Sequence, residues 1–389
     1  MGKVEKNSEK RRVLLVVRWP VGGIRTFLRY VYRHFDPDLW QFTLVLPEID
    51  GLDALINDLA PLKIRYQFVK GIKTDETFGY GRFARAVWKE LLKNRYSLVH
   101  SHGFTSAMCV APFSLLFRTP HVLTAHETLN DGQFPGLLGR IKRFVVGFNL
   151  KMVNCLHSVS CDAEQNLLHF FPALAKHPER LFVIPNGIEI ERFLTANSIG
   201  LRKKINVGEN VFLIGFFGRF MSPKGFRHLV EAMEILAQQG QLHNKALVIT
   251  YGRGGFFERD RREVERRGLT EFFRFMPFEP NIAGAIKEVD VVVMPSLWEA
   301  CGLLAMETLV CGTPLIASNC IGLREVIKDT PAIQIPVRNA QAIADALKEI
   351  MEKPCKDSFT AFVAEAAKRF NVQKQVKGLE KLYNQLVAG

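Results

Sequence analysis

The sequence lacks the features that would direct it into a membrane or through one. No apolar run in its 389 residues reaches the ~18–20 residues that a bilayer-spanning helix needs. The first ten residues carry charges of both signs and lack the apolar core of a signal peptide. These two absences predict a cytoplasmic protein.

Cysteine and clustered carboxylates are also scarce. The seven cysteines are scattered and never take a C-x-x-C spacing. They therefore indicate free, mostly buried thiols rather than a zinc site or a disulfide framework. No acidic cluster suggests a divalent-ion site, and no D-x-D stands at the end of a predicted strand. We therefore expect no metal and no other cofactor.

Charge is not scarce, but it has a dominant sign. The net charge is +13 and the pI is about 9.4, with a larger positive excess in residues 1–197 than in the remainder. Such a charge suits nucleic acid, anionic lipid or an anionic nucleotide. The sequence has no nucleic-acid-binding module, and its aromatic residues are not interleaved with basic ones in a stacking pattern. Nucleic acid is therefore not an expected partner.

Short apolar strands alternate with helical segments along both halves of the chain, which predicts an α/β fold with doubly wound parallel sheets. The length is sufficient for two domains of roughly 190 residues each. The pattern loses its periodicity and gains charge over residues 186–210, as a linker does. We therefore predict domains at residues 1–196 and 197–371.

One stretch, residues 290–326, combines several features of a binding site. It is predicted to form a buried strand, a loop that contains Glu299, a short helix that contains Glu307, and a second buried strand. Ligands of open α/β sheets bind at the carboxyl ends of the strands. The two glutamates would therefore lie on either side of a ligand at this edge.

The start of that helix is a candidate anion site. Gly302, Leu303 and Leu304 fall in its first turn, where backbone N–H groups have no acceptor within the helix. Earlier in the chain, Arg219 and Lys224 flank a glycine turn after the strand predicted at residues 211–217. A guanidinium binds phosphate oxygens in pairs and an ammonium binds them as a point charge. The two cations could therefore neutralise a diphosphate.

These motifs carry a resemblance to a known family. The frame PSxxExxGLxxxExxxxGxPxI, with Glu299 and Glu307, is similar to the signature of retaining GT-B glycosyltransferases of family 4. The string around Arg219 and Lys224 resembles the family's G-R-x-x-x-x-K-G element. The resemblance implies two Rossmann-like domains with a cleft between them, and a last helix, at about residues 372–389, that packs back on the first domain.

The resemblance also implies roles for the second domain. Arg219, Lys224 and the helix start would bind the diphosphate of a nucleotide-sugar donor. Glu307 would bind ribose hydroxyls and Glu299 a sugar hydroxyl. The sequence around Gly252 and around Met276 departs from the family's usual forms, which leaves the base of the donor open: a UDP-sugar is favoured and a GDP-sugar remains an alternative.

Two elements of the first domain fit the same resemblance. Gly22 and Gly23 follow the first predicted strand, and their counterparts in the family border the diphosphate and the acceptor. His126 stands in a T-x-H context after a strand, where family members place a histidine that faces the reacting sugar, and His102 is a candidate neighbour. From the residues alone, a plain tight turn and a loop histidine that caps backbone groups remain alternatives.

The resemblance predicts a retaining, metal-independent transfer of a hexose to a glycan or lipid-linked acceptor in cell-envelope polysaccharide biosynthesis. His126, Glu299, Arg219 and Lys224 are the catalytic candidates. Fixed cations and amide dipoles would stabilise the leaving nucleoside diphosphate, and front-face attack is the preferred route. A nucleotide-sugar epimerase and a non-enzymatic protein that binds anions or membranes are the alternatives.

Residues 136–151 add a prediction about the membrane. This predicted helix carries basic and large apolar residues together, which suits an anionic membrane surface or an anionic acceptor. A solvated face on an ordinary packed helix is the alternative. The first reading predicts that the basic first domain makes a peripheral contact with the inner face of a membrane.

Overall fold

The computed structural model describes residues 10–49, 52–71, 79–242 and 246–388. These residues form two compact units. The first unit extends to Asn186 and resumes at Val372, and the second unit extends from Gly187 to Asn371. The chain therefore passes from the first unit to the second and returns to the first with its last helix.

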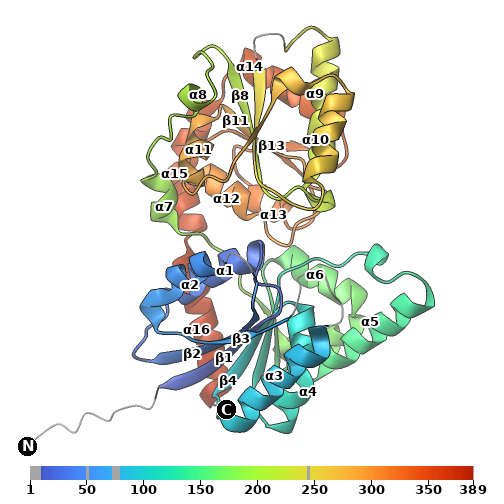
Figure 1. The fold of residues 1–389 in the computed structure, drawn as a ribbon, viewed down its shortest axis with the longest axis vertical. Helices are drawn as coiled ribbons and strands as arrows, with labels where there is room; N and C mark the ends of the chain where they lie inside the picture. Colours follow the sequence, from blue (N-terminus) through green and yellow to red (C-terminus); the bar gives the residue numbers. More distant parts are fainter. Residues whose placement is uncertain (1–9, 50–51, 72–78, 243–245, 389) are drawn as a thin grey trace, which may run out of the picture. The chain divides into compact units, whose positions relative to one another are not determined.

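The first unit is built on a parallel sheet of seven strands in the order β3-β2-β1-β4-β5-β6-β7 (Figure 1). The strands are β1 (Arg11–Val17), β2 (Trp40–Pro47), β3 (Arg65–Val69), β4 (Leu98–His102), β5 (His121–Ala125), β6 (Cys155–Ser158) and β7 (Leu181–Val183). Helices cover both faces of the sheet, so its central strands are buried on both sides, as in β1, where Val13–Val17 are fully buried. The strand order reverses between β1 and β4, which makes their carboxyl ends the place where a ligand is expected.

Two groups of helices cover this sheet. Helix α3 (Tyr80–Lys93) packs on α4 (Phe104–Leu116), and α4 packs on α5 (Gly136–Lys151). Helix α1 (Gly23–Tyr32) packs on both α2 (Asp53–Leu59) and the last helix, α16 (Val372–Ala388). Helix α6 (Cys161–Phe170) leads from β6 towards β7. Helix α16 is held by apolar residues at helical spacing, all at most 3% exposed: Val376, Leu379, Leu382 and Tyr383.

The second unit repeats the plan with six parallel strands in the order β10-β9-β8-β11-β12-β13. The strands are β8 (Phe212–Phe217), β9 (Ala246–Tyr251), β10 (Phe273–Met276), β11 (Val291–Met294), β12 (Leu315–Ser318) and β13 (Ile333–Ile335). The β-branched run of β11 is fully buried at Val291–Val293. In this sheet the order reverses between β8 and β11, which brings the carboxyl ends of those two strands together.

The helices of the second unit also form two groups. Helix α9 (Phe226–Gln238) contacts α10 (Phe257–Arg266) and α14 (Ala340–Glu352). Helix α12 (Leu303–Val310) contacts α7 (Ile190–Leu194), α11 (Ile282–Glu288), α13 (Arg324–Ile327) and α15 (Lys356–Arg369). The short α8 (Leu201–Lys204) lies beside α11.

The division between the units differs from the predicted boundary near residue 196. Residues 187–204, which lack clear periodicity in the sequence, belong to the second unit. They are fixed there because Phe193 is fully buried and because the Glu288 carboxylate accepts hydrogen bonds from the backbone N–H groups of Gly200 and Leu201. Helices as short as α7 and α8 depend on such tertiary contacts, which a sequence pattern does not reveal.

Candidate functional site

The reversal of strand order in the second sheet brings two predicted site residues into contact. Lys224 follows β8 and Glu299 follows β11, and the Lys224 Nζ lies 2.7 Å from the Glu299 Oε1. The Ser296 hydroxyl donates to the same carboxylate oxygen at 2.8 Å. Both bonds are made to Oε1.

Glycine allows the loops after β8 and β11 to approach each other this closely. Gly225 has a φ of +66°, and a Cβ atom added to it would lie 1.9 Å from the carbonyl oxygen of Pro295. The two loops are also joined by a backbone bond from the Leu297 N–H to the Pro223 carbonyl, 2.7 Å long. The position of Lys224 therefore depends on a contact that any larger residue at position 225 would break.

The loop after β9 packs against the turn that follows β8. A Cβ atom added to Gly252 would lie 1.8 Å from the Gly218 carbonyl oxygen, and one added to Gly254 would lie 2.4 Å from the Phe220 carbonyl oxygen. These contacts hold the turn that carries Arg219. The Arg219 side chain is exposed, and no carboxylate in the described parts of the chain forms an ion pair with it. Its guanidinium is thus placed for an anion from solution.

The start of α12 is close to the predicted arrangement, with one difference. Gly302 is the N-cap residue and offers no side chain to the first turn. The Leu303 N–H, however, donates to the Cys301 carbonyl at 2.9 Å. One of the three N–H groups that the sequence predicted to be free is therefore engaged in a local turn, and Gly302 and Leu304 remain the candidates for an anion.

The two glutamates keep their predicted places. Glu299 is in the loop between β11 and α12, where its N–H donates to the Ile321 carbonyl at 3.0 Å. Its backbone is also tightly packed, because a Cβ atom on Gly322 would lie 2.2 Å from the Glu299 carbonyl oxygen. Glu307 is half-buried on α12, between the first and second turns. The Glu299 side chain contacts the predicted cation Lys224.

The glycine pair after β1 divides into two different roles. Gly22 is the N-cap residue of α1 and adopts φ 59° and ψ −132°, a conformation that is open to glycine alone. Gly23 needs no such freedom, and a Cβ atom added to it would meet nothing within 4 Å in the described structure. Gly22 thus sets the turn, whereas Gly23 leaves space above the backbone.

His126 lies just past β5 and is half-buried. Its Nε2 is 2.9 Å from the Nδ1 of His102 at the end of β4, and the two rings stack with centroids 5.2 Å apart. The ring of Phe27, on α1, packs edge-on against His126 at 4.8 Å. The histidine that the resemblance pointed to is therefore held from two sides, and its neighbour is the expected one.

Behind His126 lies a buried cluster of hydrogen-bonding side chains, which we call the histidine network. The Tyr32 hydroxyl oxygen lies 2.8 Å from the His102 Nε2 and 3.0 Å from the His100 Nδ1. The His100 Nε2 is 2.6 Å from the Thr124 hydroxyl, which is 2.8 Å from the His157 Nδ1. All of these side chains are fully buried. They come from α1, β4, β5 and β6, so the network ties the centre of the sheet to the helix beside it.

The inner end of the network fixes where its protons lie. The His157 Nε2 is 2.9 Å from the Ile184 carbonyl oxygen, which can only accept, so Nε2 carries the proton. The Nδ1 of the neutral ring then accepts from the Thr124 hydroxyl. The Thr124 oxygen in turn accepts from the His100 Nε2–H, which leaves the His100 Nδ1 as an acceptor.

The assignment continues outwards to His126. The hydroxyl of Tyr383, on α16, is closer to the His100 Nδ1 than that of Tyr32, so we assign Tyr383 as its donor. The Tyr32 hydroxyl is closer to the His102 Nε2, at 2.8 Å, than to the Tyr383 oxygen, at 3.2 Å, so we assign it as the donor to His102. On this assignment the His102 Nδ1–H donates to the His126 Nε2. His126 therefore presents an Nδ1–H group, a donor without charge.

Burial keeps these rings neutral. Desolvation lowers the pKa of His126 to about 3 and that of His157 to about 4. The pKa values of His100 and His102 lie well below the usual value for histidine, again because of burial and then because of the neighbouring rings. Desolvation disfavours the charged form of a base, so the network is uncharged at neutral pH.

Arg18, at the carboxyl edge of the first sheet, was not identified as a candidate site residue from the sequence. Arg18 directly follows β1, is 3% exposed, and its guanidinium lies 4.0 Å from the ring centre of Tyr80. The Arg18 N–H also donates to the Ser106 hydroxyl at 2.9 Å. Its position at the end of a predicted strand was the available signal, because polar residues at that edge face a ligand site.

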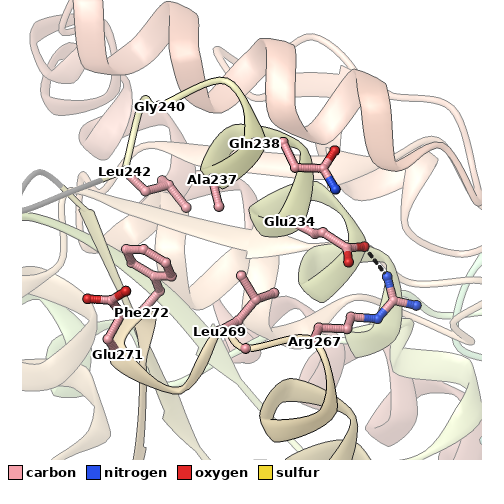
Figure 2. A pocket seen from close by; sticks show the side chains of 10 residues that line it. Glu234, Ala237, Gln238, Gly240, Leu242, Arg267, Leu269, Glu271 and Phe272 are labelled. Carbon is pink, nitrogen blue, oxygen red and sulfur yellow. Dashed lines mark hydrogen bonds and ion pairs between the residues drawn. The ribbon is translucent and has the colours of Figure 1, made fainter.

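A cavity of about 400 Å³ in the second unit lies elsewhere (Figure 2). Its lining comes from the end of α9, the end of α10 and the turn after it, and includes the ion pair between Glu234 and Arg267. Helix α9 begins at the carboxyl edge of the sheet and runs back along it. The cavity therefore lies towards the amino ends of the strands and is not part of the candidate site.

Two further observations concern the described residues as a whole. They include no group of three or more His, Cys, Asp or Glu side chains arranged to hold a metal ion. Within the same residues, no helix combines the length and the apolar character that crossing a bilayer requires.

Comparison with known proteins identifies the family. A family model described as Glycosyltransferase Family 4 matches residues 21–192, and one described as Glycosyl transferases group 1 matches residues 199–370. The chain belongs to the family 4 glycosyltransferases. The predicted family is thus confirmed on both units, and the general prediction of a glycosyltransferase is confirmed with it.

Curated relatives of this glycosyltransferase agree with that family. A D-inositol 3-phosphate glycosyltransferase from Corynebacterium jeikeium is 26% identical over 75% of this chain and 73% of the relative. The protein of the same name from Paenarthrobacter aurescens is 27% identical over 77% of this chain and 75% of its own length.

Solved structures confirm the predicted fold class. A sucrose-phosphate synthase from Thermosynechococcus elongatus aligns with a TM-score of 0.82 at 20% identity, over 98% of this chain and all of the other. Anabaena Alr3699/HepE, solved in complex with UDP-glucose, aligns with a TM-score of 0.78 at 21% identity, over 97% of this chain and 100% of that one. At such identities the likeness concerns the fold, which is the GT-B arrangement of two doubly wound α/β units.

Proposed function

We propose that this glycosyltransferase moves a hexose from a UDP-sugar to a glycan or lipid-linked acceptor in cell-envelope polysaccharide biosynthesis, with retention of configuration and without a metal. The observation that carries the proposal is the contact between Lys224 and Glu299, which places a cation and a carboxylate together where the strand order reverses. We choose UDP as the nucleotide of the donor because Anabaena Alr3699/HepE, which has a similar fold, was solved in complex with UDP and with UDP-glucose.

The diphosphate would bind between the two cations and the start of α12. An ammonium has three donors, so Lys224 can keep its bond to Glu299 and still donate to a phosphate oxygen. Arg219, exposed at the turn after β8, would bind a second phosphate oxygen. The N–H groups of Gly302 and Leu304 would complete the site, since the first turn of a helix favours an anion.

The hydroxyl groups of the donor would bind the two glutamates. The Glu299 Oε1 is occupied by Lys224 and Ser296, so a sugar hydroxyl would donate to Oε2. Glu307, half-buried on α12, would accept from the ribose hydroxyls. This division of roles explains why the site needs a carboxylate on each side of the helix start.

The chemistry requires the leaving diphosphate to be stabilised as the glycosidic bond breaks. Charge grows on the phosphate oxygens in the transition state, and fixed cations next to them lower the barrier because they need no reorganisation. Arg219 and Lys224 would provide that charge. His126 would donate its Nδ1–H to the transferred sugar, and Gly23 would leave room for the ligand. The acceptor would then attack from the face that the diphosphate leaves.

Binding of free nucleotides tests the donor site first. We expect UDP to raise the melting temperature more than GDP or ADP, because a ligand at 100 times its Kd stabilises the folded protein by about 2.7 kcal/mol. Arg219→Ala and Lys224→Ala should remove most of that shift. Arg261→Ala, which removes an exposed arginine on α10, should leave it unchanged. Equal shifts in all three variants would refute the assignment of the diphosphate site.

Transfer itself requires a donor and an acceptor. Anomeric proton NMR of the product should show the configuration of the donor, and EDTA should leave the rate unchanged. Turnover of the donor with no acceptor present would favour an epimerase instead. A trapped covalent glycosyl-enzyme would exclude front-face attack.

A further inference from the structure

Helix α5 of the first unit presents its large apolar residues to solvent. We call this group the apolar stripe of α5; its members and their exposed fractions are Leu137 (71%), Leu138 (81%), Ile141 (52%), Phe144 (74%), Val145 (38%) and Phe148 (56%). These positions are spaced as one face of an α-helix. The stripe is therefore a continuous apolar surface along the 16 residues of the helix, and not a set of isolated exposed side chains.

The opposite face of α5 attaches the helix to its unit through a small number of buried residues. The buried positions are Gly139, Val146 and Leu150. A Cβ atom on Gly139 would lie 2.0 Å from the carbonyl carbon of Phe134, and one on Gly147 would lie 3.2 Å from the ring of Phe171. A helix that packs on its own core normally buries its large apolar side chains. Here Leu150 is buried, but the six large apolar residues of the stripe are exposed, and Figure 1 shows α5 at the outer side of the first unit.

The charges of α5 decide what can cover the stripe. The helix has four basic residues and no acidic one. At 3.6 residues per turn, Arg140 and Lys151 flank one edge of the stripe and Lys142 flanks the other. Arg143 points inwards, where its Nε donates to the Phe170 carbonyl at 2.9 Å. Three cations therefore border the apolar surface on both sides.

A second copy of the chain would be a poor partner for this surface. Two stripes packed face to face would bring the cations of both helices together, and no carboxylate on α5 is available to pair with them. An anionic bilayer meets both requirements, because its headgroups carry negative charge and its acyl boundary accepts apolar side chains. We propose that the apolar stripe of α5 inserts into the interface of an anionic membrane and that the flanking cations bind lipid phosphates.

This inference goes beyond the proposed function and does not depend on it, since it concerns a surface of the first unit that carries none of the candidate site residues. If it is correct, the chain binds a membrane surface through one helix that lies parallel to the bilayer. A lipid-linked acceptor would then be met at the surface where the protein already resides.

Vesicle cosedimentation with the full chain tests the proposal. We expect the chain to bind vesicles of phosphatidylcholine mixed with phosphatidylglycerol, and to bind vesicles of pure phosphatidylcholine at least tenfold more weakly. Leu138→Ser combined with Phe144→Ser should weaken binding to the anionic vesicles by tenfold or more. Both side chains are more than 70% exposed, so the variant should remain folded, which circular dichroism can check.

The matched control is Leu92→Ser, which removes an apolar side chain on α3 that is 61% exposed and should leave vesicle binding unchanged. Replacing Arg140 and Lys151 with Gln should reduce binding and weaken its dependence on salt. The proposal fails if the chain does not bind anionic vesicles or if the stripe variant binds as well as the original. It also fails if ultracentrifugation shows a dimer that the stripe variant converts to a monomer, because the stripe would then be an interface between copies.

Discussion

Lowering the pH from 7.5 to 5.5 should destabilise the first unit, because four of its histidines are fully buried as neutral rings. Desolvation lowers the pKa of each of them: His100, His102, His121 and His157. Where a value is defined it is about 3 or about 4. In the unfolded chain a histidine has a pKa of about 6.5. Below that pH the unfolded chain binds protons that the folded unit does not.

The size of the effect follows from proton linkage. Each such histidine contributes stability that is fully present above pH 6.5 and is lost as the pH falls towards the folded pKa of about 3 to 4. Between pH 7.5 and 5.5 the loss is about 1.4 kcal/mol per ring. His121 and His157, the fully buried rings with a defined pKa, together give about 3 kcal/mol, a large part of the free energy of unfolding of an ordinary domain. His100 and His102 act in the same direction.

Urea unfolding followed by tryptophan fluorescence can measure this loss. Trp19, Trp40 and Trp88 lie in the first unit and Trp298 in the second, so a Trp298→Phe background reports the first unit alone. We expect the free energy of unfolding to fall steeply between pH 7.5 and 5.5. An unchanged value, or histidine ring resonances that titrate near pH 6.5 in the folded protein, would refute the reasoning.

Two variants separate buried histidines from exposed ones. His177 is exposed, so His177→Gln should leave the pH dependence as it was. His121 is fully buried between the hydroxyls of Ser101 and Ser114. Its replacement with Asn should lower stability at pH 7.5 but reduce the loss on acidification by about 1.4 kcal/mol. The relevant measurement is the change in the free energy of unfolding between pH 7.5 and 5.5, because any core substitution also changes the free energy of unfolding at a single pH.

Three other outcomes follow from the contacts. Tyr32→Phe should cost about 1–3 kcal/mol in urea unfolding because it removes the hydroxyl that we assign as the donor to His102. Tyr66→Phe removes a buried hydroxyl that has no hydrogen-bond partner among the described residues and should cost nothing. Gly225→Ala should destabilise the second unit by about 2 kcal/mol or more and weaken UDP binding, because the alanine Cβ would clash with the Pro295 carbonyl oxygen at a positive φ. Gly255→Ala should change neither stability nor UDP binding, because its Cβ would meet no atom within 4 Å. Glu299→Gln should reduce the transfer rate at least tenfold, which corresponds to about 1.4 kcal/mol in the activation free energy. The Kd for UDP, which lacks the sugar, should stay within threefold of the original value. A larger change in that Kd would indicate that Glu299 binds the nucleotide instead.

Much of the second unit could be read from the sequence, because its strands are short apolar runs bounded by glycine and proline. The strand predicted at residues 211–217 is observed at Phe212–Phe217, and the strand of the glutamate stretch is observed where it was expected. The contact between Lys224 and Glu299 spans 75 positions, yet it was foreseeable. Both residues follow strands whose carboxyl ends meet at the reversal of strand order.

The features that escaped prediction depend on distant or local contacts without a pattern. His100 and His102 are two positions apart on β4 and therefore point to the same face of the sheet. This spacing could have predicted that the two histidines lie close together. Tyr383, which contacts His100, lies 283 positions further along the chain. The spacing of apolar residues on α16 does not predict this contact. The bond from the Leu303 N–H to Cys301 depends on the exact turn before α12. The short helices of residues 187–204 depend on tertiary contacts such as those of Phe193 and Glu288.

The two units place different chemistry at equivalent positions of their sheets. Beside β8 and β11 lies the ion pair of Lys224 and Glu299. Beside β1, β4 and β5 lie the buried Arg18 and the histidines of the network, and desolvation lowers the pKa of His126 to about 3. A protonated imidazole would attract phosphate, whereas a neutral N–H donor binds a sugar hydroxyl without doing so. In the proposed reaction the buried network behind His126 would therefore do more than orient the ring, because it would also keep the imidazole neutral and available as a donor to a sugar hydroxyl.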